Sequence, residues 1–84
     1  MDNLQTPSQA VRGARPDAET FDKVYLFKKV SILRATYQIR LLALHAGAAG
    51  KKLVLKVPPN CRFEASLDAL VQAVPDVIHR EDLP

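Results

Sequence analysis

The clearest pattern in the chain is an alternation of apolar and polar positions between residues 51 and 57. Leu53, Leu55 and Val57 recur at every second position, and two lysines stand among the positions between them. Because side chains of an extended strand point alternately to its two faces, this pattern predicts a half-buried β-strand. The Pro-Pro pair that follows ends the strand, since proline lacks the N–H group that a strand ladder needs.

A second strand is predicted over residues 23–30, where aromatic and β-branched residues are concentrated. Alternation along it would put two aromatic and two lysine side chains on one face, namely Lys23, Tyr25, Phe27 and Lys29. The opposite face would carry Val24, Leu26 and Val30. A rival interpretation is one long helix from Asp17 to Ala49, because apolar residues there also recur every three or four positions. The residue types favour the strand.

Two helices are predicted around the central strand. The first covers residues 32–47, with Ser31 as its N-terminal cap and a glycine at its end. The second ends near Val74, with Asn60 or Ser66 as its cap and a proline after it.

The first predicted helix is more apolar than a helix with one buried face requires. Besides its main apolar stripe, it has a second one made of Leu33, Tyr37, Leu41 and Leu44. We expect another surface to cover this second stripe. A rival interpretation makes residues 37–45 a strand, paired in a hairpin with the strand at 51–57, but the many Ala and Leu residues favour the helix.

With a short last strand at residues 77–79, the order of elements is β-α-β-α-β. We expect an α/β or α+β fold, a small two-layer domain with two helices packed on a short, mainly parallel three-stranded sheet whose other face is open. Residues 1–19 lack a sustained apolar period, so we expect a mostly disordered tail there and a single domain at 20–84. A chain of 84 residues buries a modest core, which favours association with a partner.

Composition narrows the class of protein. A hydrophobic content of 48% and a charged content of 25% are typical of a soluble globular domain. No apolar run approaches the roughly 20 residues of a membrane span, and no secretory signal is recognisable, so we expect a cytoplasmic protein. The single cysteine, Cys61, excludes an internal disulfide framework and an all-cysteine zinc site.

Charge is distributed unevenly along the chain. All the lysines and arginines except three arginines lie between Lys23 and Arg62, where there is no acidic residue. Such a segment can bind an anionic partner, or it can pair internally with the acidic ends. Aromatic side chains flanked by lysines resemble in chemistry the sheet surfaces that stack single-stranded bases. The candidate anion-binding or nucleic-acid-binding residues are Lys23, Tyr25, Phe27, Lys29, Lys52 and Lys56. The alternative is that the aromatics belong to the core and the lysines are solvated.

Catalytic and metal-binding motifs are not found. No glycine-rich phosphate loop and no nucleophile elbow occur, and His45, His79 and Cys61 show no metal-ligand spacing, so we expect no metal and no cofactor. Cys61 is the one candidate for a reactive thiol, because it follows the central strand and would open the second helix, whose dipole lowers a thiol pKa. The simpler interpretation is a small apolar residue.

These observations predict a small non-enzymatic binding or regulatory module that engages a protein partner or self-associates. The alternative is binding of single-stranded nucleic acid through the basic segment 23–62, and a thiol-dependent activity at Cys61 comes third. We do not expect a membrane partner. Salt separates the first two functions, because neutralising phosphates releases counterions whereas an apolar protein interface is less sensitive to salt.

Overall fold

The computed structural model of the protein describes residues 15–83. Most of the predicted tail, residues 1–14, lies outside the described part of the chain. The described elements are β1 (Ala18–Glu19), β2 (Lys23–Phe27), β3 (Ile32–Leu33), α2 (Tyr37–Ala48), β4 (Lys52–Val57), β5 (Arg62–Phe63), α3 (Ala65–Ala73) and β6 (Ile78–Asp82). The mixed α and β class and the order of the main elements confirm the prediction.

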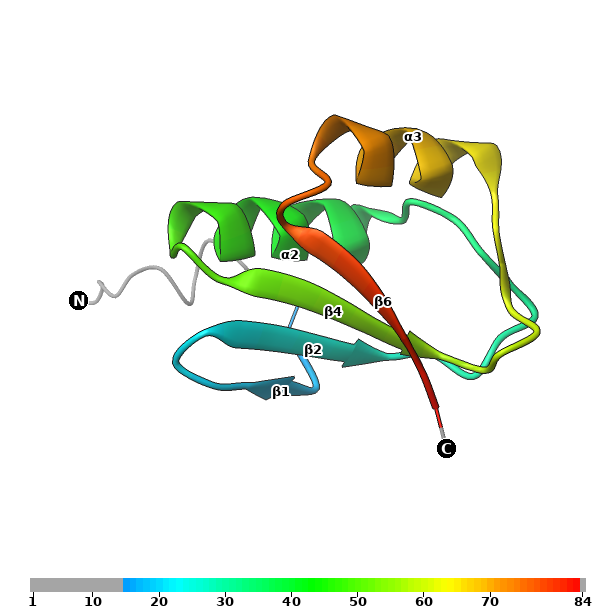
Figure 1. Cartoon of the computed structure of the whole chain (residues 1–84), viewed down its shortest axis with the longest axis horizontal. Coiled ribbons are helices and arrows are strands. Elements are labelled where there is room, and N and C mark those ends of the chain that lie inside the picture. Colours follow the sequence, from blue (N-terminus) through cyan, green and yellow to red (C-terminus); the bar gives the residue numbers. More distant parts are fainter. Residues whose placement is uncertain (1–14, 84) are drawn as a thin grey trace.

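The main sheet has the strand order β1-β2-β4-β6. The central strand β4 runs parallel to both neighbours, with Leu53 opposite Val24 on β2 and opposite Ile78 on β6. A fourth strand was not predicted: β1 pairs antiparallel with β2 and places Ala18 opposite Tyr25. Both helices lie on one face of this sheet, and no described element covers the other face (Figure 1).

A second, two-stranded sheet explains why the first helix begins later than predicted. Ile32 and Leu33 form β3, which runs parallel to β5 with Ile32 opposite Arg62. Helix α2 therefore starts at Tyr37, and the predicted cap Ser31 is wrong. The cap is Thr36, whose hydroxyl oxygen accepts a hydrogen bond from the backbone N–H of Ile39 at 3.2 Å. The segment is a helix, so the hairpin alternative is excluded.

Helix α3 follows β5 directly and begins without a side-chain cap. Glu64 occupies the N-cap position but makes no capping hydrogen bond, and neither Asn60 nor Ser66 caps the helix. The Ser66 hydroxyl instead accepts a hydrogen bond from the backbone N–H of Ala35 at 3.0 Å and donates one to Glu64 at 2.6 Å. Ser66 thus links the start of α3 to the chain that leads into α2.

The core lies between the sheet and the helix layer. Leu53, Leu55, Val57 and Leu67 are fully buried, and Leu70 and Val71 of α3 are partly buried against them. Strand β2 adds its even-numbered residues and α2 its inner face; the other large members are Val24, Leu26, Ile39, Leu42 and Ile78. The apolar side chains of the strand that the sequence predicts therefore point toward the helices, as expected.

Candidate functional site

One candidate surface is the face of the main sheet that lies opposite the helices. The register brings alternate side chains of β2, β4 and β6 side by side on it. We call this surface the open face, and its residues are Lys23, Tyr25, Phe27, Lys52, Val54, Lys56, His79 and Glu81. Five of the six predicted anion-binding residues lie here.

The two aromatic side chains of the open face do not belong to the core. The rings of Tyr25 and Phe27 lie 6.3 Å apart between centroids and are tilted by 48°. Phe27 is 45% exposed, whereas its neighbour Leu26 is buried on the other side of the strand. Val54 lies opposite Tyr25 and is only 2% exposed, so it forms an apolar floor between the strands. The face offers apolar surface for a flat ligand.

The lysines of the open face all have partners. Lys23 forms an ion pair with Asp22 at 3.2 Å, and Lys56 forms one with Glu81 at 3.3 Å. The Lys52 ammonium donates a hydrogen bond to the carbonyl of Asp76 at 2.5 Å. A cavity of about 370 Å³ opens between these groups and His79. The face is therefore less positive than the sequence suggests, because nearby acids neutralise two of its three lysines.

The pKa values of the first of these ion pairs shift in opposite directions. The pKa of Asp22 is lowered, because the Thr20 hydroxyl and then the Lys23 ammonium donate hydrogen bonds to its carboxylate. The pKa of Lys23 is raised, chiefly by the same hydrogen bond to Asp22. Both groups remain charged at neutral pH, and both are in contact with solvent.

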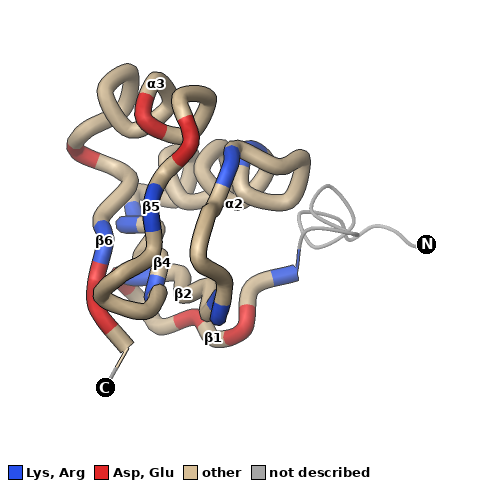
Figure 2. The backbone as a smooth tube through the Cα atoms, turned by 90° about the vertical axis from the view of Figure 1, so that its right-hand side faces the viewer, with Lys and Arg blue, Asp and Glu red and all other residues tan. Residues whose placement is uncertain are grey.

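Lys29 is not brought together with the other candidate residues. Strand β2 ends at Phe27, so Lys29 lies beyond it and lines a different cavity of about 360 Å³ with Pro58, Pro59 and Leu83. This cavity lies at the carboxyl end of the parallel strands. Figure 2 shows that end of the molecule, with Lys or Arg on β5 and β6 and with Asp and Glu on α3 and toward the end of β6.

Cys61 lies in the core and not at the start of a helix. It is 3% exposed, and it precedes strand β5, so no helix dipole acts on its thiol. The Sγ atom makes one weak hydrogen bond, to the carbonyl of Arg62 at 3.7 Å. Cys61 is therefore placed as a small apolar side chain would be, and a reagent can reach its thiol only if the core opens.

The second candidate surface lies on the helix layer. Tyr37 and Leu44, two members of the second apolar stripe of α2, are 72% and 70% exposed. Leu33 is buried and Leu41 is partly buried, so the structure covers only half of this stripe.

Beside Leu44 a cavity of about 430 Å³ separates the two helices. We call it the helix groove. Its lining is apolar apart from one arginine: Arg40, Ala43, Leu44, Gly47 and Ala48 from α2, and Leu70, Val74 and Val77 from α3 and the segment after it. No described residue fills it. An amphipathic helix of another protein can lay its apolar face into an apolar groove.

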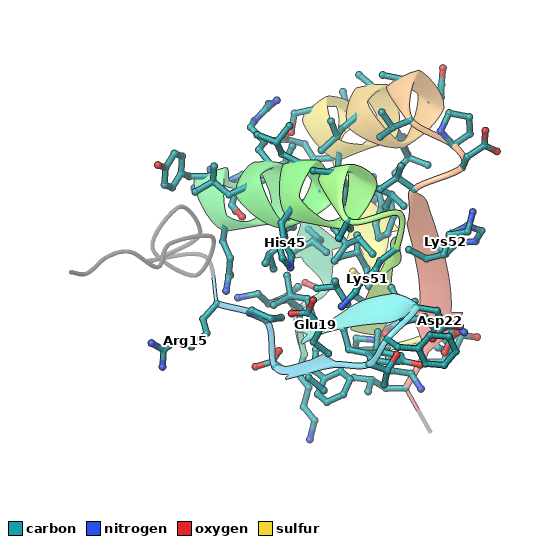
Figure 3. The ribbon with its side chains drawn as sticks, turned by 90° about the vertical axis from the view of Figure 1, so that its left-hand side faces the viewer. Arg15, Glu19, Asp22, His45, Lys51 and Lys52 are labelled. Atoms are coloured by element: carbon teal, nitrogen blue, oxygen red, sulfur yellow. The ribbon has the colours of Figure 1, made fainter. Side chains whose placement is uncertain are left out.

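An ion-pair cluster that joins β1 to the helix layer was not predicted. The Glu19 carboxylate contacts both the His45 ring at 3.0 Å and the Lys51 ammonium at 2.6 Å (Figure 3). The hydrogen bond from Lys51 is the main cause of a lowered pKa at Glu19. The contact joins strand β1 to α2 and to the start of β4. The three residues are distant in sequence and carry no local motif, so pattern analysis had no signal for them.

Between residues 15 and 83 no group of three or more His, Cys, Asp or Glu side chains could hold a metal ion. Within the same range, no helix is long and apolar enough to cross a membrane.

Neither a scan against models of protein families nor searches of curated proteins and of solved structures find a match for this chain.

Proposed function

We propose that this protein is a small non-enzymatic binding module that engages a protein surface through its helix groove. The observation that carries the proposal is the 70% exposure of Leu44 beside an apolar groove of about 430 Å³. Burying a leucine side chain contributes about 1.5–3 kcal/mol, so leaving this one in water forgoes a large fraction of that stabilisation. A bound protein surface would recover it.

The shape of the groove supports a helix or a helix pair as the element that binds. Helices α2 and α3 form its two walls, and Gly47 and Ala48 keep the α2 wall low. Small side chains let a partner backbone approach closely, and Leu44 would fill a gap between the apolar residues of that partner. One cation, Arg40, lies at the rim and would orient an acidic residue of the partner.

A selection of displayed amphipathic helices tests this proposal. The protein is immobilised at low density, so that its copies do not meet. The affinity of each selected helix is then compared between the unmodified protein, a groove variant and a control variant. We expect enriched helices to bind the unmodified protein and to lose at least about tenfold in affinity on Leu44→Asp, a change of roughly 1.4 kcal/mol. The matched control is Phe21→Asp, which changes an apolar residue that is 91% exposed and outside the groove. No enrichment over the Leu44→Asp surface would contradict the proposal.

A second candidate function, binding of single-stranded nucleic acid, is favoured by the open face. Tyr25 and Phe27 lie outside the core, next to Lys56 on the neighbouring strand. Aromatic side chains in such a place stack bases, each worth about 1–3 kcal/mol. The internal ion pairs of Lys23 and Lys56 weigh against strong binding, because phosphates would have to replace Asp22 and Glu81.

Fluorescence anisotropy with a labelled single-stranded oligonucleotide tests this candidate. With the three lysines of the open face engaged, log affinity should fall with log salt with a slope of about −2, which is roughly −0.7 for each phosphate. Phe27→Ala should weaken binding by about tenfold or more without unfolding the domain. A loss of folding on Phe27→Ala, or no binding at low salt, would remove this candidate.

A further inference from the structure

We infer that the outer edge of β3, the edge that faces away from β5, binds an acidic peptide in extended conformation. The peptide would add a third strand to the small sheet of β3 and β5. The cavity beside this edge shares no residue with the helix groove, so the inference goes beyond the proposed function and is tested separately from it.

The basic segment 23–62 contains both paired and unpaired cations. Three of its lysines contact acidic side chains, and one lysine and Arg40 donate hydrogen bonds to backbone carbonyls. The remaining cations form no ion pair with a residue in the described range 15–83, namely Lys28, Lys29, Arg34 and Arg62. All four lie on β5 or on the chain between β2 and α2, which carries β3 (Figure 2). The unpaired part of the basic segment is therefore gathered at the small sheet.

The backbone of β3 has one edge without a partner strand. At the other edge, the N–H groups of Arg62 and Glu64 donate hydrogen bonds to the carbonyls of Ser31 and Leu33, both at 2.8 Å. Successive residues of a strand direct their backbone groups to opposite edges, so the N–H and C=O of Ile32 face away from β5. The small sheet has only these two strands among the described residues. A peptide backbone offers both the donor and the acceptor that such an edge pairs with, whereas a phosphate chain does not.

The side chains beside this edge match a peptide with an apolar centre and acidic ends. A cavity of about 400 Å³ is lined by alternate residues of the chain 28–34, namely Lys28, Val30, Ile32 and Arg34. The two apolar residues are 38% and 59% exposed, and a cation flanks them on each side along the chain. Paired strands place opposite side chains on the same face, so valines would contact the apolar residues and glutamates the cations. Glu64 is the one acid in the lining, and the Ser66 hydroxyl donates a hydrogen bond to its carboxylate at 2.6 Å.

These features specify a peptide that can be made. The sequence Glu-Thr-Val-Thr-Val-Thr-Glu, blocked at both ends, puts its acidic and apolar side chains on one face and spans about 23 Å at about 3.3 Å per residue. It has the same pattern in both directions, so the orientation of the added strand need not be known. A contact of this size is weak, and its ion pairs are exposed, so we expect reversible binding that weakens as salt screens the charges.

Fluorescence anisotropy with the labelled peptide at low salt tests the inference. Replacing both glutamates of the peptide by glutamine should weaken binding by about fivefold, the usual scale for two exposed ion pairs. Arg34→Glu in the protein should weaken it by about tenfold, because a like charge replaces an opposite one. The matched control is Arg15→Glu, the same charge change at an exposed residue that precedes β1 in the other sheet. It should bind the peptide as the unmodified protein does, and circular dichroism should show both variants folded.

A charge exchange tests whether the two ends of the peptide meet the two cations. A peptide with lysine in place of both glutamates should not bind the unmodified protein. It should bind the double variant Lys28→Glu/Arg34→Glu, in which the charges are exchanged. Recovery of binding in this combination supports the proposed register, and no recovery would contradict it.

Methylation of alternate backbone amides in the peptide separates strand addition from general charge attraction. Only every second N–H group of a strand faces a given neighbour, so one of the two methylated peptides should bind and the other should not. Charge attraction alone would treat both peptides alike.

Three results would overturn the inference. One is no binding of the peptide at low salt, and another is equal binding of the two methylated peptides. The third is a single-stranded oligonucleotide that binds more tightly than the peptide and loses its affinity on Arg34→Glu, which would make this edge a nucleic-acid site. Helices selected on the helix groove should bind Arg34→Glu and the unmodified protein equally, so the failure of this inference leaves the proposed function standing.

Discussion

Replacing Leu55 by alanine is expected to remove a quarter or more of the free energy of unfolding. Leu55 is fully buried in the middle of β4, between β2 and β6. Losing three carbon atoms from the core costs about 2.4 kcal/mol at roughly 0.8 kcal/mol each, and the remaining cavity raises the cost to about 3–4 kcal/mol. A domain of 84 residues has a stability of about 4–12 kcal/mol at the usual value per residue.

Leu44→Ala is a matched control, because it makes the same chemical change on the helix layer. Leu44 is 70% exposed, so at most about a third of the transfer term is lost, which is under about 1 kcal/mol. Alanine also has the higher helix propensity, which reduces the cost further. The difference between the two variants therefore gives the part of the loss in free energy of unfolding that comes from the burial of the leucine side chain.

Urea unfolding followed by circular dichroism, at a protein concentration low enough to keep the chain monomeric, measures both free energies. The midpoint should fall steeply for Leu55→Ala and hardly at all for Leu44→Ala, with similar slopes. Equal losses for the two variants, or a loss below about 1 kcal/mol for Leu55→Ala, would refute the assignment of β4 to the core and of Leu44 to solvent.

Three further predictions follow from single contacts. Glu19 has a folded-state pKa below its ordinary value of 4.5, so its contact with Lys51 stabilises the fold above that pH and is lost as pH falls through the lowered value. Thermal melts should show a smaller loss of stability between neutral and acid pH in Glu19→Gln than in the unmodified protein. Equal losses would contradict a stabilising contact between Glu19 and Lys51. Thr36→Ala should lower the free energy of unfolding by about 1 kcal/mol in urea, because it removes the cap of α2; an unchanged midpoint would argue against that cap. The thiol of Cys61 should react with a disulfide reagent only as fast as the protein opens, and a reaction complete within the mixing time under native conditions would show an accessible thiol.

The parts of the fold that the sequence predicts are those with a strong local pattern. The alternation from Leu53 to Val57 and the apolar and aromatic residues of β2 identify both strands and the direction of each side chain. The same alternation puts Tyr25 and Phe27 together on one face of β2, but it leaves open whether that face is buried, and the structure turns the face away from the helices. The period decides the case of β4, whereas in β2 both a strand period and a helical period fit and the residue types decide between them.

Elements that depend on distant partners could not be predicted. The two residues of β1 have low strand propensity and form a strand only because β2 offers an edge. Ile32 and Leu33 fit a helical pattern, but pairing with β5 takes them into a strand. Tertiary contacts override local preference in both cases.

The candidate sites show the same division. The second apolar stripe of α2 is visible in the sequence, yet the groove beside it depends on where Leu70 and Val74 of α3 lie. The lysines of the open face are likewise visible, but their neutralisation by Asp22 and Glu81 follows from the strand register and the turn before β2. Position in sequence does not specify either arrangement.

Amide spectra by nuclear magnetic resonance, recorded while a helix selected on the unmodified protein is added, test the central claim most directly, namely that the helix groove is the surface that binds a protein partner. Between the free and the bound protein, the amide signals of Arg40, Leu44 and Gly47 should shift together with those of α3. The signals of Tyr25 and Phe27 on the open face should stay in place. Shifts confined to the open face, or no shift on either surface, would contradict the account.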